Sequence, residues 1–384
     1  MIEIPAHIDF RFRKENDTYV IWLAAINRYL QLKEPAFEVF KKWANGCSRN
    51  KIVKECCNRY HLPLKESKRF VNEIITEIQS LYNACYPEKQ VTRQENVKKI
   101  EQVCFSEYYY QFDHHLIQIQ YGNKYLEDLF HPLFRQYKSE SGDITPTRFE
   151  LYTVERHDLF LINGTIHSSF HIEDVDSLQG AVYMELLNII HNKSNADWMG
   201  VLHALAVTDG NSAILFSAPS GNGKSSIALL MMAKGYNLFS DDFVPIALDA
   251  PEIYHFPSEV SIKPGAIPFL KKHVPELYQT IKDWEDKNQD SELFVSPFSK
   301  TELHSQMRTN AIVFVNYDPE TEYTLTRESN LKMMDHFLLQ AWINNSPEAA
   351  GRFLEWYFSL PIYTLRYSDN IKAINGIGEL FESE

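Results

Sequence analysis

The sequence predicts an α/β protein with two folded domains, a small α+β domain over residues 1–85 and a larger α/β domain over residues 105–384. Two observations lead to this prediction. In residues 1–85, three short aromatic and β-branched segments precede three segments whose apolar residues recur at helical spacing. In the larger part, an apolar segment runs into a glycine-rich loop and then into a second apolar segment, which is the strand–loop–helix order of α/β folds.

Three strands and three helices are expected in the first domain. The strands are Phe10–Arg13, Tyr19–Leu23 and Arg28–Leu32, separated by polar turns. The first helix spans Glu34–Ala44 and ends before an Asn-Gly pair, which favours helix termination. A second helix begins after Ser48, a residue type suited to a helix N-cap, and a third runs from Leu64 to Tyr82.

A polar and mostly charged segment, "YPEKQVTRQENVKKIEQ", separates the two domains at Tyr86–Gln102. We interpret residues 86–104 as a linker, and an exposed helix is the alternative.

Strands and helices are mixed in the larger domain. Expected strands are Leu116–Tyr121, Arg148–Val154, Leu159–Asn163, Ser168–Ile172, Val201–Val207, Ala213–Ala218 and Asn310–Asp318. Expected helices are Leu178–His191, the segment "SSIALLMMAKG" that Gly235 closes, and a helix that starts at Ser346-Pro347 and ends near Phe358.

The loop "SGNGKSS", between the strand at Ala213–Ala218 and the following helix, has the composition of a phosphate-binding loop. Glycines let backbone amides approach anionic oxygens, lysine supplies positive charge, and a hydroxyl can bind magnesium. The pattern G-x-x-x-x-G-K-[ST] is met except that Ala218 replaces the first glycine. We therefore expect a nucleotide site formed by Ser220, Gly221, Asn222, Gly223, Lys224, Ser225 and Ser226.

Two neighbouring carboxylates, Asp241 and Asp242, end the strand that follows the loop helix. A carboxylate beside a phosphate loop is suited to bind magnesium, and a pair of carboxylates is also suited to acid–base chemistry. A polar turn without chemistry is the alternative, but the nearby loop favours a functional role.

Loop, helix, glycine and aspartate pair together resemble the HPr kinase/phosphorylase family and the related phosphoenolpyruvate carboxykinase core. The matching residues are "SGNGKS", Gly235 and the Asp241-Asp242 pair, with "HALAV" from His203 on the preceding strand, where Ala204 replaces a glycine of the family pattern. The resemblance is specific over residues 201–243.

This resemblance implies phosphorylation of a serine by ATP, or another nucleoside triphosphate, with Mg²⁺. Ser225 and Asp241 would hold the metal, Asp242 would take the proton from the acceptor hydroxyl, and His203 would tune Asp242. The two aspartates can exchange roles, and a core position for His203 is the alternative to a catalytic one. Family precedent also implies assembly into a homo-oligomer.

The sequence departs from this family after the aspartates. The second glycine-rich signature is absent, and "HFPSEVSIKPGA" stands in its place, with Glu259 and Lys263 as groups that can reach phosphates or metal. Phosphorolysis and HPr as the substrate therefore do not follow. The closer resemblance is to shorter HPr-kinase-like enzymes associated with modified-peptide biosynthesis.

The first domain resembles the winged fold of PqqD-type peptide-recognition domains in its layout of three strands, an aromatic-rich helix and two further helices. The resemblance implies that a leader peptide binds as an added strand along Tyr29, Leu30, Gln31 and Leu32, against Val71 and Ile75 of the third helix. A core face is the alternative for the helix residues.

These features predict a kinase that phosphorylates Ser or Thr of a ribosomally made precursor peptide, held through its leader. Tethering of this kind raises the local concentration of a weak acceptor. Two alternatives remain: a kinase of a small molecule, and a winged-helix DNA-binding regulator with a nucleotide sensor.

The charge distribution disfavours nucleic acid as a partner. The net charge is −13; residues 1–85 carry +4, from 14 Lys and Arg against 10 Asp and Glu, so the remainder carries −17. No apolar run approaches 18 residues, so no membrane span is expected. Five cysteines without a C-x-x-C pair or an apolar signal segment indicate a reduced, cytoplasmic chain without a structural metal site.

Overall fold

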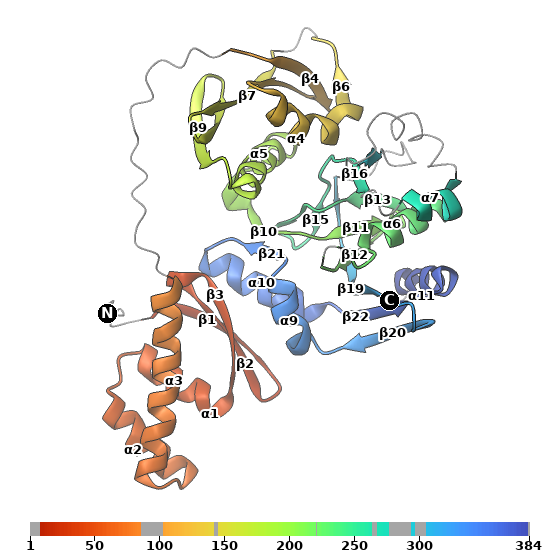
Figure 1. Ribbon diagram of the computed structural model, residues 1–384. Helices are drawn as coiled ribbons and strands as arrows, with labels where there is room; N and C mark the ends of the chain where they lie inside the picture. The colour runs from red at the N-terminus through yellow and green to blue at the C-terminus, as the bar shows by residue number, and fades with distance from the viewer. Residues whose placement is uncertain are drawn as a thin grey trace. The chain divides into compact units, whose positions relative to one another are not determined.

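The computed structural model describes residues 8–85, 103–141, 145–219, 221–262, 267–275, 293–295 and 305–382. The chain is a mixture of helices and strands that divides into two compact units, which Figure 1 shows with their elements. One unit holds residues 1–98 and 343–359, and the other holds residues 99–342 and 360–384. Residues 86–102, the greater part of the expected linker, lie outside the described residues.

The first unit confirms the expected order of three strands and three helices. Its elements are β1 (Phe10–Glu15), β2 (Thr18–Leu23), β3 (Arg28–Lys33), α1 (Glu34–Ala44), α2 (Arg49–Tyr60) and α3 (Leu64–Cys85). The strands form an antiparallel sheet in the order β1-β2-β3, so β3 is an edge strand. Tyr19 and Ile21 of β2 pack with Phe37 and Phe40 of α1 on one face of this sheet.

A helix from late in the sequence, α10 (Pro347–Ser359), also belongs to this unit and contacts β1. The Tyr29 ring lies edge-on to Phe353 with centroids 5.4 Å apart. The Asn27 amide donates a hydrogen bond of 2.9 Å to the Ile343 carbonyl, and its oxygen accepts one of 2.7 Å from the Trp22 indole. The sheet is therefore covered on both faces, which explains why every residue of β2 is buried.

This helix corrects the expected domain boundary, because residues 343–359 were assigned to a continuous domain of residues 105–384. The physical reason lies in β2, whose buried run "TYVIWL" is apolar on both faces. Such a run is typical of a strand covered on both sides, and α1, α2 and α3 alone do not supply the second layer.

The second unit begins with a six-stranded sheet in the order β6-β4-β5-β7-β8-β9. Its strands are β4 (Ser106–Phe112), β5 (His115–Tyr121), β6 (Lys138–Ser139), β7 (Thr147–Val154), β8 (His157–Ile162) and β9 (Thr165–His171). Two helices, α4 (Lys124–Phe134) and α5 (Val175–Ile190), pack on its core through Phe130, Phe134 and Val182. The four strands and the helix expected in this region are confirmed.

A second six-stranded sheet contains the strand before the loop and has the order β13-β11-β12-β19-β22-β20. Its strands are β11 (Leu205–Thr208), β12 (Ala213–Ser217), β13 (Asn237–Ser240), β19 (Thr309–Tyr317), β20 (Tyr323–Glu328) and β22 (Ile362–Tyr367). The central strands β12, β19 and β22 are parallel, and α6 (Lys224–Ala233) shares one core with α11 (Asn370–Glu382). This sheet places the C-terminal ends of parallel strands next to the loop.

A five-stranded sheet, β18-β15-β14-β10-β21, corrects the expected strand at Val201–Val207. Its strands are β10 (Trp198–Leu202), β14 (Val244–Ala247), β15 (Ile253–Tyr254), β18 (Gln306–Met307) and β21 (Ala341–Ile343). The chain leaves β10 at His203 and enters β11 in the neighbouring sheet, so one apolar run makes two strands. Cross-strand pairing, which is a tertiary property, decides where this run breaks.

Further described elements are β16 (Val260–Ile262), which pairs with β17 (Leu293–Val295), the helices α7 (Ile267–His273) and α9 (Asn330–Leu338), and three short 3-10 helices at Ala24–Ile26, Arg135–Tyr137 and Asn195–Asp197. Among the described residues, no helix is long and apolar enough to cross a membrane.

Removing the Phe353 side chain should loosen the N-terminal sheet, because this fully buried ring packs on Tyr29. Phe353→Ala should lower the free energy of opening of β1–β3 by about 3–5 kcal/mol, measured as faster amide hydrogen exchange over residues 10–33. Glu355→Ala, an exposed position on the same helix, is the control and should change it by about 0.5 kcal/mol or less. Unchanged exchange in β1–β3 would contradict the assignment of α10 to this unit.

Candidate functional site

The glycine loop joins β12 to α6 as the sequence predicts. Gly221 and Gly223 have φ of +90° and +92°, a backbone conformation that residues with a side chain rarely adopt. Gly223 is the N-cap of α6, whose first residue is Lys224. The Tyr317 amide at the end of β19 donates a hydrogen bond of 3.2 Å to the Asn222 carbonyl, which fixes the loop to the parallel sheet. Ser220 lies outside the described residues.

Gly223 also approaches its neighbours closely. A Cβ atom at this position would lie 3.1 Å from the Tyr367 hydroxyl and 3.4 Å from Cβ of Tyr317. Glycine is favoured here chiefly by the positive φ, and the limited space adds a smaller penalty for a side chain. A glycine N-cap has no side chain that can cap the first-turn amides of α6, and these amides are suited to an anion.

The aspartate pair follows β13 and is brought to the loop. Asp241 is buried at 5% exposure, whereas the side chain of Asp242 is 48% exposed. The Lys224 ammonium donates a hydrogen bond of 2.5 Å to Oδ1 of Asp242. Asp242 has a φ of +57°, and the Phe243 amide donates to the Asp241 carbonyl at 2.8 Å across this tight turn. Aspartate is among the residues that tolerate a positive φ best.

His203 lies where the chain passes from β10 to β11. Its Nε2 atom is 3.7 Å from Oδ1 of Asp242, and its side chain is 56% exposed. The His203 amide donates a hydrogen bond of 2.7 Å to the Gln340 carbonyl, which fixes the backbone at this strand break. The alternative of a buried core histidine is therefore wrong.

The segment Phe256–Glu259 contacts the chain at the aspartates. The Ser240 hydroxyl accepts a hydrogen bond of 2.9 Å from the Phe256 amide, and the Ser258 hydroxyl donates one of 3.5 Å to the Asp241 carbonyl. Glu259 is buried and forms an ion pair with Arg135, in which Nη2 lies 3.0 Å from Oε2. Sequence reasoning missed Arg135, which lies 124 residues from Glu259. Lys263 lies outside the described residues.

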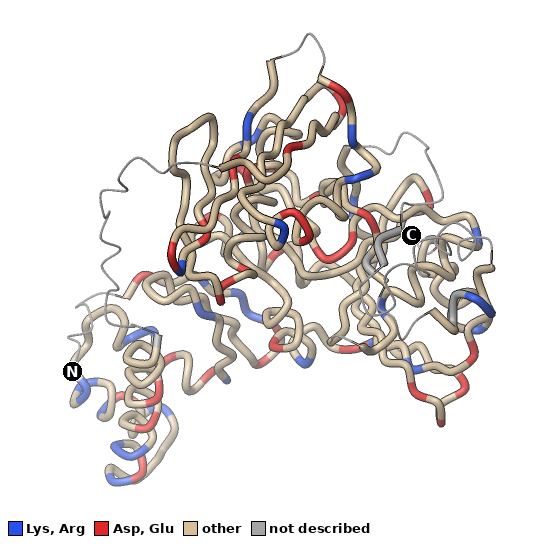
Figure 2. The backbone as a smooth tube through the Cα atoms, turned by 45° about the horizontal axis from the view of Figure 1, so that its top comes forward, with Lys and Arg blue, Asp and Glu red and all other residues tan. Residues whose placement is uncertain are grey.

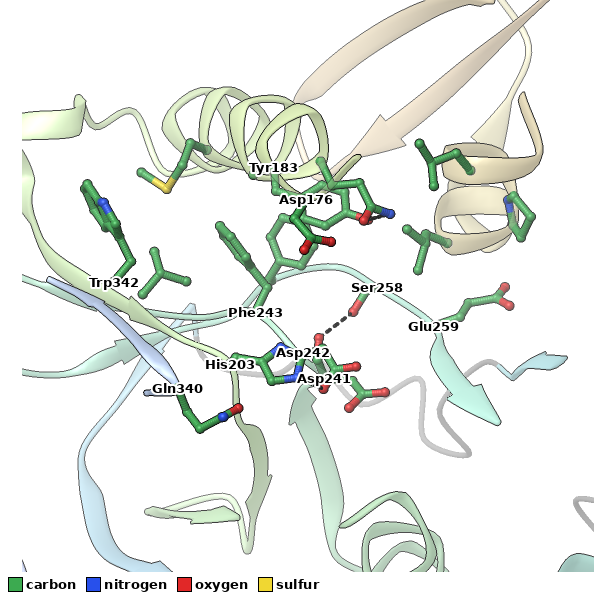
Figure 3. Close-up of a pocket in the computed structure, with 18 of the residues that line it drawn as sticks. Asp176, Tyr183, His203, Asp241, Asp242, Phe243, Ser258, Glu259, Gln340 and Trp342 are labelled. Atoms are coloured by element: carbon green, nitrogen blue, oxygen red, sulfur yellow. Dashed lines mark hydrogen bonds and ion pairs between the residues drawn. The ribbon is translucent and has the colours of Figure 1, made fainter. Parts of the chain in front are cut away.

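A cavity of about 1280 Å³ opens beside the aspartates, as Figure 3 shows. Asp241, Asp242 and His203 line it, and none of the described loop residues does. The other lining residues are Val201 of β10, Phe243, and residues from α4, α5, the Phe256–Glu259 segment and the chain just after α9. Asp242 therefore contacts Lys224 and also lines the cavity.

Tyr183 of α5 lines the cavity near Asp242. Burial, together with the Asp242 carboxylate, raises the pKa of the Tyr183 hydroxyl well above its ordinary value. This hydroxyl accepts a hydrogen bond of 3.2 Å from the Gln179 amide. It therefore stays protonated at neutral pH and can donate a hydrogen bond.

The oxygen groups of Ser225, Asp241 and Asp242 are chemically suited to magnesium. Among the described residues, no group of three or more His, Cys, Asp or Glu side chains is placed to hold a metal ion. Mg²⁺ that arrives with a nucleotide needs only one or two carboxylates, because phosphate and water oxygens complete its coordination. Ser225 in the first turn of α6 and the buried Asp241 after β13 fit that requirement.

The expected peptide site has two parts, a strand and a helix face, and only the strand lies at an edge of the fold. Tyr29, Leu30, Gln31 and Leu32 all lie in the edge strand β3. Val71 and Ile75 are fully buried in the core that α3 forms with Val39, Ile52 and Val53. These two side chains therefore hold the helices together and present no surface to a peptide, as the core alternative has it.

Comparison with protein-family models finds no family that matches the chain, and comparison with curated proteins finds no matching protein. The assignment of a function therefore depends on the geometry of the site.

Replacement of Gly223 should damage the loop specifically. Gly223→Ala forces a side chain into a left-handed conformation at a cost of about 1–2 kcal/mol, so nucleotide affinity should fall about tenfold in a titration with a fluorescent ATP analogue. Gly351→Ala is the control, because its site in α10 has open space and no positive φ. Equal affinities for both variants would contradict the assigned loop.

Proposed function

We propose that the protein is a phosphotransferase that moves the γ-phosphoryl group of ATP, or another nucleoside triphosphate, to a hydroxyl of a peptide. One observation carries this proposal. Asp242 contacts the loop lysine at 2.5 Å and also lines the cavity, so it stands between a place suited to the phosphate donor and a place suited to the acceptor.

The donor side consists of the loop, Lys224 and the first turn of α6. Backbone amides at this helix N-terminus and the Lys224 ammonium are suited to the β- and γ-phosphate oxygens. Lys224 is only 11% exposed, so its charge acts in a partly desolvated place where electrostatic attraction is stronger than in water. A bound Mg²⁺, held by Ser225 and Asp241, would neutralise phosphate charge.

On the acceptor side, Asp242 is suited to act as general base. An acceptor oxygen attacks the γ-phosphorus, the bond from that phosphorus to the β–γ bridging oxygen breaks, and ADP leaves. The hydroxyl proton passes to the Asp242 carboxylate. His203, 3.7 Å from this carboxylate, is placed to orient it or to receive the proton afterwards.

The edge strand β3 supports a peptide as the acceptor. Among the described residues β3 pairs with β2 alone, and an edge strand of this kind is where an extended peptide can add as a further strand. The basic residues of this unit do not favour the DNA-binding alternative. Basic residues of α1, α2 and α3 form ion pairs with acidic ones: Lys42 with Glu55, Arg59 with Glu38, and Arg69 with Glu73. Figure 2 shows acidic residues among the basic ones on these three helices.

Loss of the loop lysine should abolish nucleotide binding. Lys224→Ala should weaken the affinity for ATP and Mg²⁺ at least tenfold by isothermal calorimetry, because the charge that faces the phosphates is removed. Lys234→Ala, at the other end of α6 and exposed, should bind normally. Undiminished ATP binding by Lys224→Ala would refute the donor site.

Loss of the proposed base should stop transfer and leave nucleotide binding intact. Asp242→Asn should lower kcat for peptide phosphorylation by about 10²–10⁴-fold, because asparagine cannot accept the proton. Asp113→Asn is a close control, since Asp113 is also exposed with a positive φ, in the turn between β4 and β5. The assay incubates short peptides encoded beside the gene with ATP and Mg²⁺ and weighs the products. If Asp242→Asn left the rate of phosphoryl transfer unchanged, Asp242 would be excluded as the general base.

Peptide addition at β3 should slow amide exchange in that strand. Deleting residues 1–85 is a poor test, because it would also strip α10 of its partner sheet. With a peptide substrate at saturation, residues 28–33 should exchange at least tenfold more slowly, whereas β9, an edge strand of another sheet, should not change. Protection at β9 but not at β3 would contradict this mode of binding.

A further inference from the structure

We infer that the cavity beside Asp242 selects a polypeptide acceptor whose hydroxyl residue is flanked by a bulky apolar side chain and has no acidic neighbour. This inference depends on the proposed function and names the substrate class of the same site. Three observations carry it: the aromatic wall next to the base, the exposed apolar residues at the cavity mouth, and the charge of the lining.

The wall next to Asp242 is aromatic. Phe243 follows the base directly in the sequence, and its ring centroid lies 4.7 Å from that of Phe256. Tyr183 lies 5.5 Å from Phe243 and 5.2 Å from Phe256, so the three rings form one cluster that lines the cavity. An acceptor hydroxyl at Asp242 therefore lies within reach of an aromatic surface, which suits a large apolar side chain at a neighbouring position.

The mouth of the cavity carries apolar residues that are exposed to water. Leu339 is 79% exposed and Trp342 is 51% exposed, and both line the cavity. The hydrogen bond from the His203 amide to the Gln340 carbonyl holds this segment beside the catalytic residues. Figure 3 shows Trp342 at one end of the cavity and Glu259 at the other, with Asp242 between them. Exposed apolar residues that meet at a cavity mark a place for a partner.

The lining repels negative charge. Five carboxylates line the cavity, those of Asp128, Asp176, Asp241, Asp242 and Glu259. Of the described lining residues, Lys124 is the one lysine or arginine, and its ammonium lies 2.8 Å from Asp128 and 3.2 Å from Glu127. Two further cations pair with lining carboxylates from outside the lining, Arg135 with Glu259 and Lys224 with Asp242. Five carboxylates against three cations leave an excess of negative charge, so an acidic residue beside the acceptor hydroxyl would be disfavoured relative to an apolar or basic one.

The size of the cavity favours a polypeptide segment over a small molecule. Pockets for small ligands usually measure about 300–1,000 Å³. The cavity of about 1280 Å³ exceeds that range and opens at exposed apolar residues, so it has room for an acceptor residue together with its neighbours.

A set of matched synthetic peptides tests this inference. Each contains one serine, and the two residues that flank it are both Phe, both Leu, both Arg, both Ala or both Asp; the protein phosphorylates them with ATP and Mg²⁺. The expected kcat/KM for the Phe and Leu peptides is at least tenfold above that of the Ala peptide. The Asp peptide should fall at least tenfold below the Ala peptide.

Two variants assign the selectivity to the cavity. Trp342→Ala should lower kcat/KM for the Phe and Leu peptides about tenfold while the KM for ATP stays constant, and Asp176→Asn should raise kcat/KM for the Asp peptide. Ile166→Ala, an exposed apolar residue on β9, should change neither value.

The possible failures are distinguishable. Phosphorylation without regard to the flanking residues, or with a preference for Asp, overturns the inference and leaves the kinase in place. No transfer to any peptide, while Lys224-dependent ATP hydrolysis continues, overturns both the inference and the proposed peptide kinase. If Trp342→Ala showed the same peptide selectivity as the control Ile166→Ala, the cavity mouth would be excluded as the source of that selectivity.

Discussion

The contact between Lys224 and Asp242 is the interaction on which the candidate site depends. It joins the start of α6 to the turn after β13, two places 18 residues apart in the sequence. Because Asp242 is about half exposed, the pair contributes little to stability, on the order of 1 kcal/mol or less. Its importance is positional, since it sets a carboxylate between the glycine loop and the cavity. Under the proposed function, a phosphate at Lys224 would compete with this carboxylate and would free Asp242 for an acceptor hydroxyl.

The sheet around this contact explains why it can form. Parallel strands β12, β19 and β22 place their C-terminal ends at one edge, where β19 holds the loop through the Tyr317 amide. The Tyr367 hydroxyl and Tyr317 leave little room for a side chain at Gly223, so the loop packs closely on residues that end two strands of the sheet. Ser240 and Ser258 support the aspartate turn from the opposite side. The candidate site thus lies in a loop and a turn at the edge of a sheet, and both are tied to that sheet by hydrogen bonds.

The N-terminal unit depends on a different constraint, the two apolar faces of β2. Tyr19 and Ile21 pack on α1. On the other face, the Trp22 indole donates a hydrogen bond to Asn27, and the Asn27 amide donates one to the Ile343 carbonyl just before α10. A three-stranded sheet with one apolar face in water would be unstable. Each Å² of apolar surface that is not buried forgoes about 25 cal/mol of folding free energy. The cover comes from residues 343–359. This segment follows Leu339 and Trp342 at the cavity mouth, so the same stretch of chain serves the cavity and then the sheet.

Local patterns in the sequence determined the helices and strands and the residues of the loop. Helix α1 has its expected bounds, Glu34–Ala44, because its apolar spacing and the Asn-Gly stop are local signals. The loop between β12 and α6 was predictable because its glycines and Lys224 belong to a local strand–loop–helix pattern. Only the tertiary structure decided the break at His203, the transfer of α10 to the N-terminal unit and the pairing of Arg135 with Glu259. Each of these depends on contacts between residues far apart in the chain, where periodicity and propensity carry no information. The cavity also depends on such contacts, because its walls come from six separate segments of the sequence that only the tertiary structure brings together.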